Sequence, residues 1–192
     1  MKKSITIIAL VFSVISGCEL FDTRNPEDPK QPRSNYQLAT TPELLFENLK
    51  KAFEEKFIDI YISIFVDTSY LDRTYRFIPS ASAALQYSIL SQWNLEAERT
   101  YFNRIISIPA AGVPVTLTLT NQSAEPGGDS ARYQFNYSLL LPNNDESLPD
   151  EYRGVARFVI HVDNTNQWVI TQWEDIEVPE YPSWSELKGR FY

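Results

Sequence analysis

The sequence predicts an α+β domain in which helices come first and then pack on a curved, four-strand antiparallel meander. In the first half of the chain, apolar residues recur at intervals of three and four, which is typical of amphipathic helices. In the second half, four successive segments alternate between apolar and polar residues, which predicts strands with one buried face. A separate apolar segment within the first eighteen residues indicates a leader that is not part of this domain.

The first helix is predicted to begin at Thr41, because this residue is a favourable N-cap and Pro42 suits the first helical position. Apolar residues at helical spacing continue to Phe53. Asp59 is predicted to cap a second, short helix.

A short strand is predicted at 75–77, followed by helical stretches at 83–90 and 95–106. Asn94 is the expected cap of the last stretch, and Glu98 lies in its first turn, where an acidic side chain favours the helix dipole.

The strands are predicted from alternation, and turn-forming residues separate them. The four alternating segments are 115–120, 132–141, 156–163 and 168–178. A capping box that starts at Ser183 predicts a last short helix running towards Phe191.

The N-terminus has the pattern of a secretory signal. Lys2 and Lys3 precede an apolar run that ends in Ser16, Gly17 and Cys18, the only cysteine of the chain. The run is shorter than the roughly 20 residues that a membrane-spanning helix needs, and a buried core cysteine would not border a polar, proline-rich tract. The residues before and including Cys18 resemble a bacterial lipobox, which implies cleavage after residue 17 and a lipid on Cys18.

Three segments follow from this interpretation: a lipoprotein signal peptide (1–17), a lipidated cysteine with a proline-rich tether (18–40) and one domain (41–192). The spacing of Pro26, Pro29 and Pro32 suits an extended, solvated tether. Glu19 follows the cysteine where lipoproteins of the inner membrane often carry aspartate. We therefore expect an outer-membrane protein facing the periplasm.

Composition argues against several classes of function. The net charge of −8 disfavours nucleic acid, whose affinity comes largely from basic side chains on phosphates. One cysteine and one histidine leave no set of ligands for a structural zinc site, and no cofactor-binding motif is visible. We expect neither metal nor cofactor.

The order of elements resembles the NTF2-like (SnoaL-like) α+β cone. The resemblance is carried by 41–53 leading into Asp59-Ile60-Tyr61, by the helix around Trp93 to Phe102, and by 168–173. It covers 41–178, and similar sequences include small bacterial lipoproteins that mostly lack an assigned activity. Because isomerases, dehydratases, cyclases and non-catalytic binding modules share this fold, the resemblance implies a fold and not one function.

Aromatic residues make up 14% of the chain, and several are predicted to point into the cone. They either fill its core or leave an incompletely filled pocket for an apolar or planar ligand. The candidate lining residues are Phe53, Tyr61, Phe65, Tyr133, Phe135, Tyr137 and Phe158.

Our first hypothesis is a non-catalytic binding or interaction module, held at the membrane by the lipid on Cys18, with no catalytic residue. The alternative is an isomerase-, dehydratase- or cyclase-type enzyme that uses Tyr61, Asp67 or Asp72 for proton transfer on a small hydrophobic substrate. His161 is expected on the outer face of its strand, away from the pocket. That outer face is a plausible contact for a second copy or an envelope protein, and a purely structural lipoprotein is a third possibility.

Overall fold

The computed structural model describes residues 35–192. Cys18, the predicted signal peptide and most of the predicted tether lie outside the described residues. Within residues 35–192, no helix is both long enough and apolar enough to cross a membrane.

The first two helices form close to the predicted positions. Helix α2 (Pro42–Glu54) begins at the Thr41 cap, whose side-chain oxygen accepts a hydrogen bond from the Leu44 amide at 3.4 Å. Helix α3 (Ile58–Ser63) begins after Phe57. The prediction that Asp59 caps α3 is therefore wrong: the chain reverses at Lys56, which has a φ of 55°, and helical geometry starts one residue before Asp59.

The middle of the chain contains more breaks than its apolar pattern indicates. Strand β1 (Arg76–Ile78) leads into α4 (Ala81–Gln86), and a 3-10 helix, η2 (Ser88–Gln92), replaces the end of the predicted stretch at 83–90. The break lies at Tyr87, whose backbone is extended. Helix α5 (Leu95–Ile105) begins at Asn94, which accepts from the Ala97 amide at 3.0 Å, as predicted.

The second half forms the predicted antiparallel meander and then a last helix, which begins at the predicted Ser183 cap. Its elements are β2 (Thr116–Gly127), β3 (Ser130–Leu140), β4 (Glu151–Val162), β5 (Trp168–Glu177) and α6 (Trp184–Arg190).

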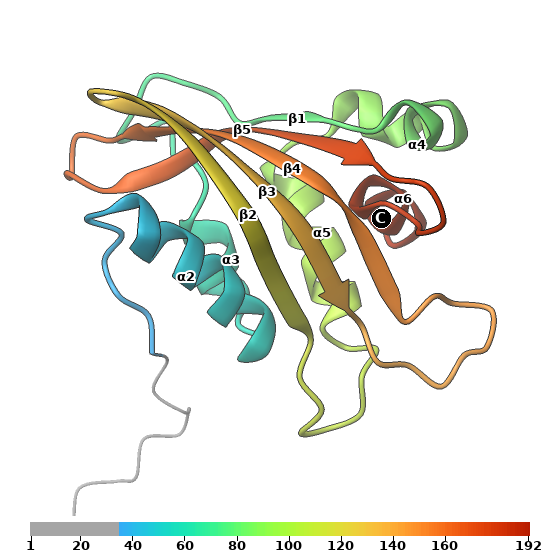
Figure 1. Cartoon of the computed structure of the whole chain (residues 1–192). Helices are drawn as coiled ribbons and strands as arrows, with labels where there is room; N and C mark the ends of the chain where they lie inside the picture. Colours follow the sequence, from blue (N-terminus) through green and yellow to red (C-terminus); the bar gives the residue numbers. More distant parts are fainter. Residues whose placement is uncertain (1–34) are drawn as a thin grey trace, which may run out of the picture. The chain divides into compact units, whose positions relative to one another are not determined.

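The sheet has five strands in the order β1-β5-β4-β3-β2, because β1 pairs with β5 in parallel. The prediction of a four-strand meander is confirmed for β2 to β5, and the short strand β1 joins its edge. Helices α2, α3 and α5 lie on one side of the strongly twisted sheet, and α6 lies beside β4 and β5 (Figure 1). We call the region between the helices and the sheet the interior.

Residues just before α2 belong to the folded domain. Ala39 is buried, and its carbonyl accepts a hydrogen bond from the Trp168 amide at 2.7 Å. The Asn48 side chain donates to the Gln37 carbonyl at 2.6 Å. The last residues of the segment assigned to the tether thus pack on the domain.

Candidate functional site

The residues predicted to line a pocket are buried in the core. Their rings pack closely: Tyr61 stacks on Phe102 with centroids 3.9 Å apart, and Phe65 meets Tyr75 edge to face at 4.7 Å. The buried set is Phe53, Tyr61, Phe65, Tyr133, Phe135, Tyr137 and Phe158.

Helix α6 completes this packing. Trp184 is fully buried, and its ring lies 4.4 Å from that of Trp173 and 5.1 Å from that of Tyr137, centroid to centroid. Its indole nitrogen donates a hydrogen bond to the Tyr101 hydroxyl at 2.7 Å. The sequence predicted this helix but not that its side chains fill the interior.

A charged cluster lies at the centre of the interior. Glu98 and Lys188 are both fully buried and form an ion pair between α5 and α6. Three more donors reach the Glu98 carboxylate: the hydroxyls of Tyr61 and Tyr75, at 2.7 and 2.6 Å, and the indole nitrogen of Trp93 at 2.8 Å. The position of Glu98 in the first turn of its helix is as predicted, but its side chain points into the core.

Aromatic rings surround the Lys188 ammonium. Its nitrogen lies 4.0 Å from the centroid of Trp173 and 4.3 Å from that of Phe77, which are cation–π contacts. Burial lowers the pKa of Lys188 to about 8, and the charge of Glu98 opposes this shift. Burial also raises the pKa of Tyr61 and of Tyr75, and the Glu98 charge raises both further.

A second buried carboxylate joins the sheet to the start of α6. Asp175 accepts from the Tyr137 hydroxyl at 2.8 Å and from the amide and hydroxyl of Ser185 at 2.6 and 2.5 Å. Burial raises its pKa, and these hydrogen bonds oppose the rise. The Tyr137 hydroxyl in turn accepts from the Trp184 amide at 2.7 Å. Both buried carboxylates are thus bonded within the protein, which suits them to holding α6 in place.

A hollow of about 630 Å³ opens at the surface where α3, the loop 66–75, the start of α5 and the β4–β5 hairpin meet. We call it the apolar hollow. Its apolar lining side chains are Ile62, Phe65, Val66, Tyr75, Leu95 and Val169. This volume lies within the range of 300–1,000 Å³ that is usual for small-molecule sites.

Several polar groups around the apolar hollow already have partners in the protein. Asp67 accepts a hydrogen bond from the Ser69 amide at 2.8 Å. Asp163 accepts from the amides of Thr165 and Gln167 at 2.8 and 3.0 Å. Asn94 caps α5. The rim therefore offers a few fixed polar groups around an apolar floor.

The three residues named for proton transfer lie apart from one another in the fold. Tyr61 is fully buried and bonded to Glu98. Asp67 is exposed on the rim of the apolar hollow, and Asp72 is exposed in the loop beyond it.

His161 lies on the opposite face of β4 from the buried Ile160, as predicted. It is half-buried rather than exposed, because a bulge brings Thr171 of β5 beside it. Its Nδ1 lies 2.9 Å from the Thr171 hydroxyl. His161 lines a second hollow, of about 900 Å³, which we call the outer hollow.

No group of three or more potential metal ligands (His, Cys, Asp or Glu) is found within the described residues. The expectation of no zinc site follows from the single histidine and the single cysteine of the sequence.

Comparison with known proteins gives the fold. No family profile matches the chain, and no curated protein sequence matches it. A solved protein of the NTF2-like family from Streptomyces avermitilis is similar, with a TM-score of 0.53 and 12% identity, over 73% of this chain and 95% of that one. The chain has the NTF2-like fold.

Two further solved structures are similar. Bd1075 of Bdellovibrio bacteriovorus matches with a TM-score of 0.50 and 9% identity, over 72% of this chain but only 40% of its own. An NTF2-like protein of unknown function from Pseudomonas putida matches with a TM-score of 0.48 and 14% identity, over 73% of this chain and 89% of that one. At these identities the likeness to NTF2-like proteins concerns the fold alone.

Proposed function

We propose that this protein is a bacterial lipoprotein, anchored through a lipid on Cys18, whose NTF2-like domain binds a small apolar or amphiphilic ligand in the apolar hollow. The domain faces the periplasm, and the outer membrane is its expected location. In this account the domain binds its ligand without transforming it.

The observation that carries the binding proposal is the contrast between the interior and the apolar hollow. Side chains of α6 pack the interior, and its buried carboxylates are bonded to the protein. The apolar hollow instead is open to the surface, and the partly buried side chains of Ile62 and Leu95 belong to its apolar lining. Apolar surface of this kind favours a ligand that removes it from water.

The end of the tether supports an amphiphilic ligand. Tyr36, the second of the described residues, lines the apolar hollow. The tether therefore meets the domain next to the proposed site. A ligand drawn from the membrane that holds the lipid anchor fits this arrangement.

The anchor is tested by replacing its attachment residue. Cys18→Ala is expected to abolish incorporation of labelled palmitate and to release the protein from the membrane fraction. Continued incorporation of palmitate into Cys18→Ala would refute lipidation at this residue.

The apolar hollow is tested with a fluorescent apolar probe. Thr74 lies exposed on its rim, so Thr74→Trp is expected to fill the hollow and weaken probe binding. Thr116 is exposed at the start of β2, away from the hollow, and Thr116→Trp is the matched control. Equal probe binding by both variants would contradict the proposed site.

A further inference from the structure

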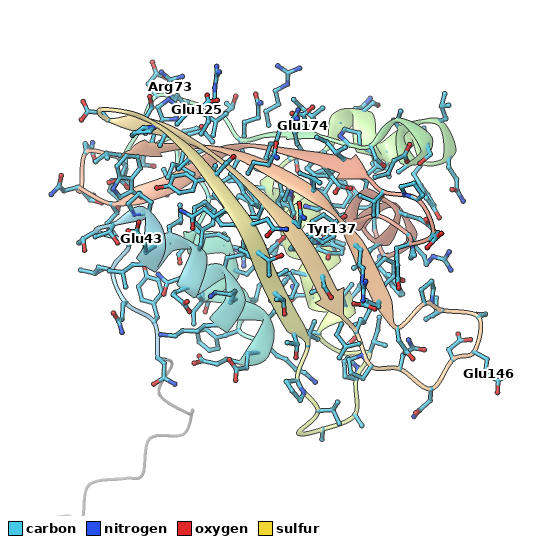
Figure 2. The ribbon with its side chains drawn as sticks, viewed as in Figure 1. Glu43, Arg73, Glu125, Tyr137, Glu146 and Glu174 are labelled. Atoms are coloured by element: carbon cyan, nitrogen blue, oxygen red, sulfur yellow. The ribbon has the colours of Figure 1, made fainter. Side chains whose placement is uncertain are left out.

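The outer hollow lies over the sheet face that His161 shares, and charged side chains from several elements meet in it. Arg73 comes from the loop after α3, and Glu125 from the end of β2. Figure 2 shows these two side chains at the same end of the sheet, with Glu174 of β5 further along. The arginine, glutamate and histidine side chains that line the outer hollow are Arg73, Glu125, Arg132, Arg157, His161 and Glu174.

The arginines of the outer hollow differ in how they are paired. Arg157 donates to the Gln134 side chain at 2.8 Å and lies 3.6 Å from the Glu174 carboxylate. Arg132 lies 4.0 Å from Glu125. For the Arg73 guanidinium, residues 35–192 provide neither a hydrogen bond nor an ion pair. Three arginines against two glutamates make this hollow positive in a chain whose net charge is −8.

His161 lines the same hollow as Arg73, and its ring is fixed by a hydrogen bond to Thr171. The Thr171 hydroxyl donates to the Val159 carbonyl at 3.1 Å, so it accepts from the Nδ1 hydrogen of His161. This hydrogen bond leaves Nε2 as the ring nitrogen available to a ligand. Both side chains line the outer hollow. Burial lowers the pKa of His161, and the positive charge of Arg73 lowers it further.

We propose that the outer hollow binds an oxyanion, of the sulfate, phosphate or carboxylate type, between Arg73 and His161. A guanidinium presents parallel N–H donors that match two oxygens of such a group. The bound anion supplies the counter-charge that Arg73 lacks. This site is independent of the apolar hollow and of the lipid on Cys18.

Binding is linked to the proton of His161. A bound anion favours the imidazolium form, so it raises the pKa of His161, and affinity increases as the pH falls through that pKa. The charged side chains facing His161 are Arg157 on its own strand, Arg73, Arg132, Glu125 and Glu174.

The single histidine of the chain makes this linkage measurable by NMR. The untagged full chain in non-ionic detergent is labelled on histidine, and the pKa of His161 is measured with increasing sulfate, which does not titrate between pH 5 and 8. Sulfate is expected to raise this pKa saturably. Arg73→Gln is expected to weaken the apparent sulfate affinity about tenfold, as loss of a charged hydrogen bond does. Arg104→Gln, on an exposed arginine near the end of α5, is expected to behave as wild type.

No saturable change with sulfate, or an equal change in Arg73→Gln, would overturn the proposal. Inorganic phosphate and phosphatidylglycerol added to the detergent micelles then distinguish the sources. A response to phosphate alone supports a soluble anion, and a response to the micellar phosphatidylglycerol as well supports a lipid headgroup. If the apolar probe fails to bind but sulfate binds, only the proposed function fails.

Discussion

Glu98 is held by side chains from four parts of the chain: Lys188 of α6, Tyr61 of α3, Tyr75 before β1 and Trp93 after η2. Breaking a buried ion pair leaves one charge without compensation, which typically costs about 3–5 kcal/mol. Removing both charges together leaves neither partner stranded. The effects of substituting Glu98 and Lys188 on the free energy of unfolding are therefore expected to be strongly coupled.

We expect Lys188→Met and Glu98→Gln each to lower the free energy of unfolding by about 3–5 kcal/mol. The double variant should lose clearly less than the sum of the two. Urea denaturation of the four proteins measures this difference. The exposed Lys50–Glu47 pair on α2 is the control, with an expected coupling of about 0.5 kcal/mol or less. Additive losses at Glu98 and Lys188 would contradict the description of this cluster.

Two buried tyrosines provide a second test of how single side chains contribute to stability. The Tyr61 hydroxyl is the donor to Oε2 of Glu98. The hydroxyl of Tyr152 is also buried, but it has no hydrogen-bond partner among residues 35–192. Tyr61→Phe is expected to lower the free energy of unfolding by about 1–3 kcal/mol, whereas Tyr152→Phe should leave it unchanged or raise it. If thermal or urea unfolding showed the same loss of stability in Tyr61→Phe and Tyr152→Phe, this distinction would be refuted.

The buried charges show why some site residues escape prediction. Glu98 precedes Phe102 and Ile105 by four and seven residues, so it shares their buried helical face. Lys188 follows Trp184 by four residues on α6 in the same way. This spacing indicates that both charged side chains face the core. For Glu98, however, the position in the first helical turn has a simpler explanation in the helix dipole, so its burial is not predicted. The pairing of two residues 90 positions apart has no local signature.

Among the elements, α6 depends on a close approach that only glycine permits. A Cβ atom on Gly189 would lie 2.3 Å from Cγ of Tyr87. Alanine is otherwise better in a helix by about 1 kcal/mol. The clash is therefore expected to reverse the usual preference.

Gly189→Ala is expected to lower the free energy of unfolding by about 1–3 kcal/mol. Combining it with Tyr87→Gly removes all three Tyr87 atoms that would clash (Cβ, Cγ and Cδ2), so the double variant should show no further loss beyond that of Tyr87→Gly alone. Chemical denaturation measures both. A stabilising effect of Gly189→Ala in the wild-type background would contradict the packing of α6.

Elements with strong local signals were predicted well. The caps at Thr41, Asn94 and Ser183 appear where expected, because each depends on neighbouring residues. The four predicted strands also form, but β2 continues seven residues further than its alternating segment and β4 begins five residues earlier. The parallel pairing of β1 with β5 was not predicted, since it joins segments almost 100 residues apart. The packing of α6 in the interior is likewise a tertiary property.

For the whole molecule, the buried tyrosines predict a particular alkaline behaviour. Burial raises the pKa of Tyr61, Tyr75, Tyr101 and Tyr137 well above the ordinary value of 10. The folded protein therefore keeps these protons at a pH where the unfolded chain has lost them. The stability that they contribute is complete below about pH 10 and is lost as the pH rises beyond it.

Spectrophotometric titration of tyrosinate at 295 nm tests this. In the native protein, part of the eleven tyrosines is expected to ionise only as the protein unfolds, whereas in urea all should titrate near pH 10. Identical native and urea curves would contradict the buried state of these hydroxyls.

The central proposal concerns ligand binding by a lipid-anchored domain, and native mass spectrometry tests it most directly. The full chain is extracted gently in detergent from cells, together with Thr74→Trp and Thr116→Trp. We expect wild type and Thr116→Trp to carry a reproducible extra mass that denaturation releases, and Thr74→Trp to carry less of it. Covalent lipid on Cys18 would stay with the chain. Only bare lipoprotein in all three samples, or an extra mass that Thr74→Trp leaves unchanged, would contradict the assignment of the apolar hollow.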